Sequence, residues 1–415
     1  MADTDRHIVI LGIGYTGLPL AVAQARLGRQ VTGFDISAER VEAVNARRSP
    51  VDTVLDAELS EVAGNLRATL DPAALAEADV VVVCAPTPVK EDDQPDLAPL
   101  ESAVATVRDH LKPGQLVIVE STTYPGTTDA LLLPILEESG LVAGVDFDLA
   151  YSPERIDPGN AKFDLSNTPR LVGGLTERSR DRAAEFYRGV TLVHLTKGMR
   201  EAEAAKILEN TFRQVNIALV NEFAQLCHSM ELDVWDTIRA AATKPYGFKV
   251  FWPGPGVGGH CIPADPLYLV HHATTLGLRF RMAETANDVN KGQPLWVADR
   301  VCKHLENSSI AVDGAKVLVL GVTYKPDIAD TRETPAEPII AQFRDRGAEV
   351  SFHDPYIDVF AGLQCVPDLA AALAGADLVV LLQPHREYSA DVLAGAARLF
   401  DTTGAAATGA AVTSL

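Results

Sequence analysis

A cysteine follows a run of glycines within residues 254–269, which read GPGVGGHCIPADPLYL, and an aspartate comes four residues after it. Glycine lacks a Cβ and tolerates positive φ, so the backbone here can turn tightly and admit a bulky ligand. We therefore expect Cys261 at the mouth of a cleft, where its thiol could act as a nucleophile and Asp265 could hold a water or a proton beside it. A buried, inert cysteine next to a turn is the alternative interpretation of the same residues.

A second chemical pattern lies near the N-terminus, where Gly12, Gly14 and Gly17 form a GxGxxG motif between an apolar run and a helical pattern. In such a turn the first glycine makes the bend, the second admits a diphosphate, and the third lets helix and strand pack. Asp35 ends the second apolar run, where an acid accepts ribose hydroxyls and repels a 2′-phosphate. The pattern predicts an NAD site; the alternative for Asp35 alone is an ordinary strand-end turn residue.

The chain has 415 residues, enough for two or three domains with their own cores, and a formal net charge of −20. This charge argues against nucleic acid or an anionic membrane as a partner. The cysteines lie far apart with no CxxC pair, so neither a disulfide framework nor a metal site is expected, and a single reactive thiol is admissible. They are Cys84, Cys227, Cys261, Cys302 and Cys365.

Apolar segments in the sequence are short. None reaches the roughly 20 residues that a membrane-spanning helix needs. The first residues enter a strand pattern with no leader signature, so we expect a cytoplasmic protein.

The elements that must position these residues follow an α/β pattern. Residues 7–37 read as a strand, a glycine turn, an amphipathic helix and a second strand, and fully apolar strands follow within 78–88 and 114–126. This alternation predicts a Rossmann-like, doubly wound parallel sheet.

The same pattern recurs within residues 315–385 without the three-glycine motif, so the second copy is expected to bind a different ligand. Between the copies, residues 197–232 form a long helical pattern with few breakers, which would connect the two domains and often carries a dimer interface. The expected fold is therefore α/β, with two Rossmann-like domains joined by a long central helix.

Several longer motifs give the sequence a family resemblance. The chain contains, in order, GIGYTGLPLA, CAPTPVKEDDQPDL, ESTTYPGTT, YSPERIDPGN, KILENTFRQVNIALVNE, PGPGVGGHCIPADPLYL and GVTYKPDIADTRETP. Together they resemble the nucleotide-sugar 6-dehydrogenases that act on UDP-glucose, UDP-N-acetylmannosamine or UDP-N-acetylglucosamine. The resemblance implies oxidation of the C6 primary alcohol of a UDP-sugar to a carboxylate with two NAD+. A thiol suits this chemistry because it retains the intermediate aldehyde as a thiohemiacetal and then as a thioester.

The resemblance also implies catalytic roles. Cys261 matches the nucleophile, and Asp265 matches the aspartate that holds water or lysine and assists proton transfer. Lys206 and Asn210, four residues apart on one helix face, match the pair that stabilises the charged oxygen at C6 and orders a water. Glu154 matches the glutamate assigned to thioester hydrolysis.

Binding roles follow from the same resemblance. Thr122 matches a threonine of the catalytic water network and of the cofactor site. The implied cofactor-binding residues are Gly12, Gly14, Tyr15, Thr16, Gly17, Asp35, Thr87, Thr122 and Arg332. The implied substrate-binding residues are Glu154, Lys206, Asn210, Gly258 and Lys325.

Three domains are implied as well. They are an NAD-binding Rossmann domain over residues 1–195, a central helical dimerisation domain with the cysteine loop over 196–305, and a UDP-sugar-binding Rossmann-like domain over 306–415. A homodimer through the central helix is expected.

Within this family, GGHC before the thiol, STTYPGTT, YSPERIDPGN and AATKPYGF are most similar to the UDP-N-acetylglucosamine branch. UDP-glucose and UDP-N-acetylmannosamine stay open, because a pocket difference of one methyl group is worth only about 1–3 kcal/mol. One departure concerns Thr403 in FDTTGAAATG, which stands where the family has a basic residue, so a cationic contact is lost. The Ala/Gly/Thr-rich tail from Gly404 onward is expected to be disordered.

Two other functions fit parts of the pattern. A two-electron NAD-dependent dehydrogenase would need a lysine but no cysteine and would release one NADH per substrate. A nucleotide-sugar-binding protein without turnover would keep the fold alone, whereas the catalytic residue types are all intact in this sequence.

Overall fold

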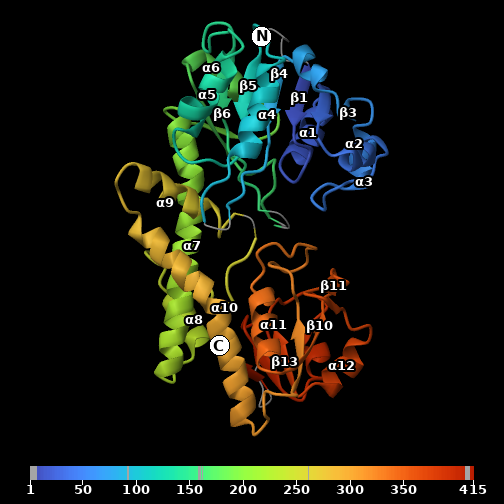
Figure 1. Ribbon diagram of the computed structural model, residues 1–415, viewed down its shortest axis with the longest axis vertical. Coiled ribbons are helices and arrows are strands. Elements are labelled where there is room, and N and C mark those ends of the chain that lie inside the picture. Colours follow the sequence, from blue (N-terminus) through green and yellow to red (C-terminus); the bar gives the residue numbers. More distant parts are fainter. Residues whose placement is uncertain (1–6, 91–92, 158–159, 161, 260, 407–411) are drawn as a thin grey trace. The chain divides into compact units, whose positions relative to one another are not determined.

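The computed structural model describes residues 7–90, 93–157, 160, 162–259, 261–406 and 412–415 (Figure 1). The chain divides into two compact units. The first unit comprises Met1–Glu209 and Leu267–Gly277, and the second comprises Asn210–Pro266 and Leu278–Leu415. Among the described residues, no helix is long and apolar enough to cross a membrane. The three-domain division at residues 195 and 305 stays a prediction.

The described part of the first unit contains an eight-stranded sheet with the order β3-β2-β1-β4-β5-β6-β7-β8. Six of these strands, β1 to β6, follow the order of a dinucleotide-binding doubly wound sheet. In this order, successive strands are added on one side of β1 as far as β3 and then, from β4 onward, on its other side. The predicted parallel sheet is confirmed for these six, and β7 runs antiparallel to β6. The strands are His7–Leu11, Gln30–Phe34, Leu66–Thr69, Val80–Val83, Leu116–Val119, Asp148–Tyr151, Arg170–Gly174 and Val193–Leu195.

Helices cover both faces of this sheet, as its buried strands require. Successive residues of a strand point to opposite faces, and in β1 Ile8 and Ile10 belong to one hydrophobic cluster while Val9 and Leu11 belong to another. The helices are α1 (Gly17–Arg26), α2 (Ala38–Asn45), α3 (Asp56–Glu61), α4 (Ala98–Arg108), α5 (Leu133–Glu137) and α6 (Glu177–Arg188), with helical turns at Pro72–Glu77 and Thr128–Leu132.

The long helix predicted over residues 197–232 is confirmed as α7, Met199–Ser229. It ends just before Glu231, which has a φ of +58°, and the side chain of Asp233 then caps the next helix, α8 (Val234–Ala242). Helix α7 contributes residues to both units. Two further helices follow, α9 (Asp265–Thr275) and α10 (Arg281–Asn307).

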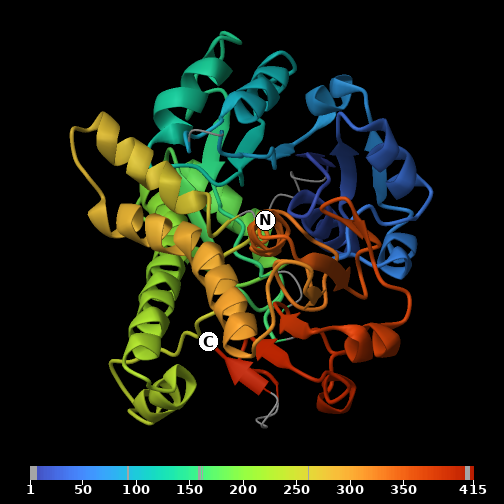
Figure 2. The ribbon, with the colours of Figure 1, turned by 60° about the horizontal axis from the view of Figure 1, so that its bottom comes forward.

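The second α/β copy is also confirmed. Among the described residues of the second unit, a five-stranded sheet has the order β10-β9-β13-β14-β15, and all its pairs are parallel (Figure 2). This is the other common doubly wound order. The strands are β9 (Lys316–Leu320), β10 (Glu349–His353), β13 (Leu378–Leu381), β14 (Leu399–Asp401) and β15 (Val412–Ser414). The remaining elements are the hairpin β11 (Val359–Phe360) with β12 (Leu363–Gln364), and helices α11 (Ala336–Asp345), α12 (Leu369–Gly375) and α13 (Ala390–Leu393).

The prediction of a disordered tail is wrong for the last residues of the chain. Val412–Ser414 pair with β14, and Leu415 packs into the hydrophobic core of the second unit. Residues 407–411 of the predicted tail lie outside the described residues. Thr403 donates from its N–H and its hydroxyl to Asp401, both at 2.7 Å, so it closes a turn at the end of β14.

Candidate active site

The glycine turn between β1 and α1 has the geometry that its sequence predicts. Gly12 has a φ of +91°, and a Cβ there would lie 2.5 Å from the carbonyl oxygen of Cys84. A Cβ on Gly17 would collide with the carbonyl oxygen of Gly12. A Cβ on Gly14 would meet no described atom within 4 Å. The first and third glycines are therefore required by packing, and the second leaves the turn open to a ligand.

Asp35 lies directly after β2 and is buried. Its Oδ2 accepts the N–H of Ile13 at 3.0 Å and its Oδ1 accepts the N–H of Ser37 at 2.8 Å. The guanidinium of Arg40 lies 3.7 Å from Oδ2. Because each carboxylate oxygen can accept more than one hydrogen bond, the fixed carboxylate suits a ribose diol. The turn and Asp35 together fit NAD.

The other cofactor candidates of the first unit lie near this turn in the chain or at neighbouring strand ends. Tyr15 is partly exposed within the turn, and Thr16 takes the N-cap position of α1. Thr87 and Thr122 follow β4 and β5, which are neighbours in the sheet. The carboxyl ends of parallel strands meet at one edge, where doubly wound sheets bind their ligands.

The second unit repeats the turn with one change. Gly321 has a φ of +77°, and Asp354 accepts the N–H of Val322 at 2.7 Å, as Asp35 accepts that of Ile13. In this copy a histidine covers the carboxylate. His385 Nδ1 accepts the N–H of Asp327 at 2.9 Å, so in the neutral ring Nε2 carries the hydrogen and donates to Asp354 at 3.0 Å.

The structure brings three catalytic candidates together in the second unit. The amide nitrogen of Asn210 donates to Oδ2 of Asp265, and the N–H of Asp265 donates to the carbonyl oxygen of Cys261 at 2.8 Å. Asp265 is buried and begins α9, whereas Cys261 is exposed. Cys261 is exposed, so it is not the buried cysteine of the alternative interpretation, and its role as a nucleophile stays a prediction.

The glycines before Cys261 serve a contact that the sequence does not reveal. A Cβ on Gly258 would lie 2.6 Å from Cβ of Tyr324, and Gly259 has a φ of +83°. The N–H of Gly259 donates to the carbonyl oxygen of Arg332 at 3.0 Å. The glycines therefore allow the segment 324–333, which carries Lys325, to pack closely against the backbone of Gly258 and Gly259. His260 lies outside the described residues.

Arg332 and Lys325 belong to this segment. The Arg332 guanidinium makes an ion pair with Asp330 of the same loop, with a shortest distance of 2.6 Å. The backbone of Lys325 accepts a hydrogen bond from the hydroxyl of Thr323 at 2.9 Å. Their predicted contacts with cofactor and substrate stay predictions.

Glu154 and Lys206 lie in the first unit. Glu154 follows β6, and its Oε1 accepts the N–H groups of Arg155 and Ile156, both at 2.6 Å. Its Oε2 accepts from Arg170 at 2.7 Å. Lys206 is buried on α7, four residues before Asn210 and hence on the same helix face.

Three structurally important groups escape sequence reasoning. Glu203 on α7 is buried and accepts from the N–H groups of Gly126 and Thr128, so it holds the segment after β5 that carries Thr122. Its only sequence signal is an acid within a helical pattern, which usually faces solvent. The others are the His385–Asp354 pair and a buried cluster behind Glu154, treated below. Among the described residues, no group of three or more His, Cys, Asp or Glu side chains could hold a metal ion.

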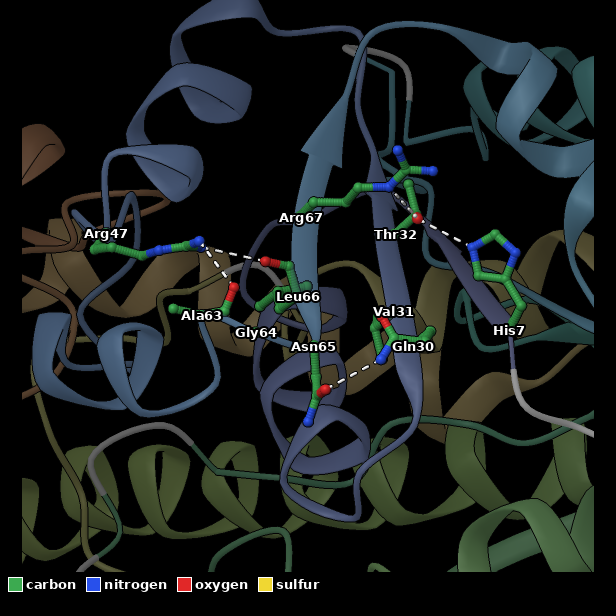
Figure 3. Close-up of a pocket in the computed structure, with 10 residues that line it drawn as sticks. All are labelled: His7, Gln30, Val31, Thr32, Arg47, Ala63, Gly64, Asn65, Leu66 and Arg67. Carbon is green, nitrogen blue, oxygen red and sulfur yellow. Dashed lines mark hydrogen bonds between the residues drawn. The ribbon is translucent and has the colours of Figure 1, made fainter.

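A separate pocket of about 400 Å³ lies at the amino ends of β1, β2 and β3 (Figure 3). It is lined by His7, Gln30, Arg47 and Arg67, among others, and Figure 3 shows Arg67 and His7 both bonded to Thr32. The described residues that line it include none of the predicted site residues. It lies at the strand ends opposite to Gly12 and Asp35, so it is not the cofactor site.

A glycine turn opening α1, a buried acid after β2 and a doubly wound sheet define the class of NAD-binding α/β proteins. Comparison with known families narrows this class. The UDP-glucose/GDP-mannose dehydrogenase family matches through its NAD binding domain at residues 6–191, its central domain at 200–292 and its UDP binding domain at 318–407. The chain belongs to this family, which confirms the predicted family and cofactor.

Two curated relatives are named for different UDP-sugars. The chain is 37% identical over 387 residues to the UDP-N-acetyl-D-mannosamine dehydrogenase of Pyrococcus horikoshii, covering 92% of this chain and 90% of the relative. It is 35% identical over 392 residues to the UDP-N-acetyl-D-glucosamine 6-dehydrogenase of Pseudomonas aeruginosa, covering 92% of each. A solved UDP-D-ManNAc dehydrogenase from Pyrococcus horikoshii has a TM-score of 0.90 at 34% identity and 98% coverage of both chains. The protein is thus an NAD-dependent UDP-sugar dehydrogenase whose sugar these comparisons do not decide.

Proposed function

We propose that this protein oxidises the C6 hydroxymethyl group of a UDP-sugar to the carboxylate through a thiohemiacetal and a thioester on Cys261. The observation that carries the proposal is the cluster in which Asn210 contacts Asp265 and Asp265 contacts the backbone of an exposed Cys261. A two-electron dehydrogenase would have no use for this thiol. The number of NADH molecules formed per sugar distinguishes the proposed reaction from a two-electron oxidation.

The first oxidation produces an aldehyde that must be retained. When bound, NAD+ supplies the hydride acceptor for both oxidations, so each sugar reduces two NAD+. Lys206 and Asn210 favour the negatively charged oxygen that forms when the C6 alcohol gives its proton to the water that these two residues order. Asp265 takes up the proton of the Cys261 thiol, and the thiolate forms a C–S bond to the aldehyde carbon while the C=O bond becomes a single bond. The thiohemiacetal carbon then loses the second hydride and its oxygen keeps no proton, which leaves the thioester on Cys261.

Hydrolysis releases the acid. In this proposal Glu154, assisted by Thr122, takes a proton from a water whose oxygen bonds to the acyl carbon of the thioester. The C–S bond breaks, and Cys261 leaves as a thiolate. Cofactor-binding roles are proposed for Gly12, Gly14, Tyr15, Thr16, Gly17, Asp35, Thr87, Thr122 and Arg332. Substrate-binding roles are proposed for Glu154, Lys206, Asn210, Gly258 and Lys325.

UDP-N-acetylglucosamine is the substrate that we propose, on the motifs around Thr122, Glu154 and Cys261. The Pseudomonas aeruginosa relative supports it, whereas several other relatives are named for UDP-N-acetylmannosamine. Measuring kcat/KM with UDP-N-acetylglucosamine, UDP-N-acetylmannosamine and UDP-glucose tests this choice. A preference for UDP-N-acetylmannosamine or UDP-glucose would show that the proposed sugar is wrong, and it would leave the proposed reaction unchanged.

We also propose a homodimer through α7. One side of this helix carries exposed apolar side chains at spacings of four, seven and seven residues, namely Leu208, Phe212, Leu219 and Leu226. An exposed apolar stripe of this length is unusual for a monomer. A second copy of the same helix is the occupant that fits it.

The covalent step is tested with Cys261→Ala. We expect this variant to lose acid formation by at least about 100-fold, because the proposed reaction holds the aldehyde on this thiol. Cys365→Ala is the matched control, since Cys365 contacts Asp354 in the second unit and has no proposed role. Acid formation by Cys261→Ala at the rate of Cys365→Ala would reject covalent catalysis.

A further inference from the structure

Behind Glu154 lies a cluster of buried ionisable side chains, Glu120, Arg170 and Tyr187, of which none is more than 2% exposed. They come from three separate elements, because Glu120 directly follows β5, Arg170 begins β7 and Tyr187 lies near the end of α6. A charged residue in such a position must be paired to be tolerated. The pairing leads directly to Glu154.

Arg170 is the centre of this cluster. Its Nη2 donates to Oε2 of Glu154 at 2.7 Å, and its Nη1 donates to the carbonyl oxygen of Pro153 at 3.1 Å. Its Nη1 also lies 3.3 Å from Oε2 of Glu120, and its guanidinium is 5.0 Å from the centre of the Tyr187 ring. With two backbone N–H groups on its other oxygen, Glu154 is held at both ends of its carboxylate.

Glu120 competes with Glu154 for the charge of Arg170. Four ionisable groups face Glu120: Arg170, Glu154, the hydroxyl of Tyr187, which donates to it, and the thiol of Cys84 at 3.8 Å. When Glu120 is ionised, the positive charge is shared between two carboxylates. When Glu120 is neutral, the whole charge acts on Glu154 and makes it a weaker proton acceptor.

We propose that Arg170 and Glu120 are positioning residues for thioester hydrolysis: Arg170 fixes the carboxylate of Glu154, and ionised Glu120 keeps that carboxylate able to take the proton of the attacking water. This inference rests on the proposed function. Burial raises the pKa of Glu120 to about 7, an effect that Arg170 opposes and Glu154 increases. Hydrolysis should therefore accelerate as the pH rises through about 7.

The test measures the rate at which the acyl group on Cys261 is hydrolysed. The reaction is quenched at successive times, and mass spectrometry gives the mass of the protein at each time. Glu120→Gln mimics the protonated residue at every pH. We expect its acyl adduct to accumulate and to decay on the order of ten-fold more slowly, without the acceleration near pH 7, while kcat/KM for the sugar is unchanged because it does not depend on the hydrolysis step. Asp148→Asn, which alters a buried carboxylate of β6 paired with Arg178 and Arg182, should keep the wild-type decay and pH profile.

Tyr187→Phe provides a second variant that preserves packing. It removes a donor that lowers the pKa of Glu120, so the acceleration should move to higher pH. If neither the wild-type enzyme nor Glu120→Gln shows an acyl adduct on Cys261, the proposed function fails. If an adduct forms and decays with the wild-type rate and pH profile in Glu120→Gln and Tyr187→Phe, this inference alone is overturned.

Discussion

At the scale of single residues, Gly12 and Gly14 can be told apart by substitution. A Cβ on Gly12 would strike the carbonyl of Cys84, whereas one on Gly14 would enter open space among the described residues. We expect Gly12→Ala to lower the free energy of unfolding of the NAD-free protein by on the order of 2 kcal/mol. Gly14→Ala should leave that free energy unchanged but weaken NAD+ binding by roughly ten-fold, because the diphosphate needs this space.

Chemical denaturation and isothermal titration calorimetry measure these two quantities. Equal destabilisation by both substitutions, or full NAD+ affinity in Gly14→Ala, would contradict this assignment of the two glycines.

The residues that the sequence alone predicts are those whose roles depend on near neighbours in the chain. The spacing of Gly12, Gly14 and Gly17 predicts their geometry because the positive φ of Gly12 and the close approach of Gly17 to the Gly12 carbonyl lie within the turn. The contact between Gly258 and Tyr324 and the pairing of Arg170 with Glu120 are different. They join segments at least 50 residues apart, and only the strand order and loop packing bring them together.

At the scale of elements, α7 has two different sides. At about 100° per residue, the stripe that runs from Leu208 to Leu226 spans about 40° of the helix circumference, while Lys206 and Asn210 lie on the opposite side. The helix can therefore present catalytic candidates on one side and bind a second copy with the other. We expect Leu219→Glu to convert the proposed dimer to a monomer, because it places a charge in the middle of the proposed apolar contact.

Analytical ultracentrifugation measures this change. Arg213→Glu is the matched control, because Arg213 is exposed on the same helix but lies at least about 100° from the stripe. A Leu219→Glu protein that sediments like the wild type and like Arg213→Glu would exclude α7 as the interface.

Most elements were predictable because their signals are local. The apolar runs of β1, β4 and β9 and the length of α7 appear in the sequence itself. Strand β15 was missed because its three residues lie in a tail of Ala, Gly and Thr, and its stability comes from pairing with β14 and from burial of Leu415.

At the scale of the whole molecule, one α/β unit occurs twice with different outcomes. Asp35 and Asp354 hold equivalent backbone N–H groups, but His385 covers only the second carboxylate. The sequence predicted the repeat and the difference in ligand from the missing glycines. It did not predict the contact of His385 with Asp354, because the two residues are 31 positions apart in the chain. They follow β13 and β10, which both pair with β9.

The central claim is a four-electron oxidation of one carbon, and counting NADH tests it most directly. Purified protein would be incubated with excess NAD+ and a limiting amount of UDP-N-acetylglucosamine, and NADH would be compared with sugar consumed and with UDP-uronic acid formed. The account predicts two NADH and one uronic acid per sugar. One NADH per sugar, with an aldehyde or ketone as product, would contradict it.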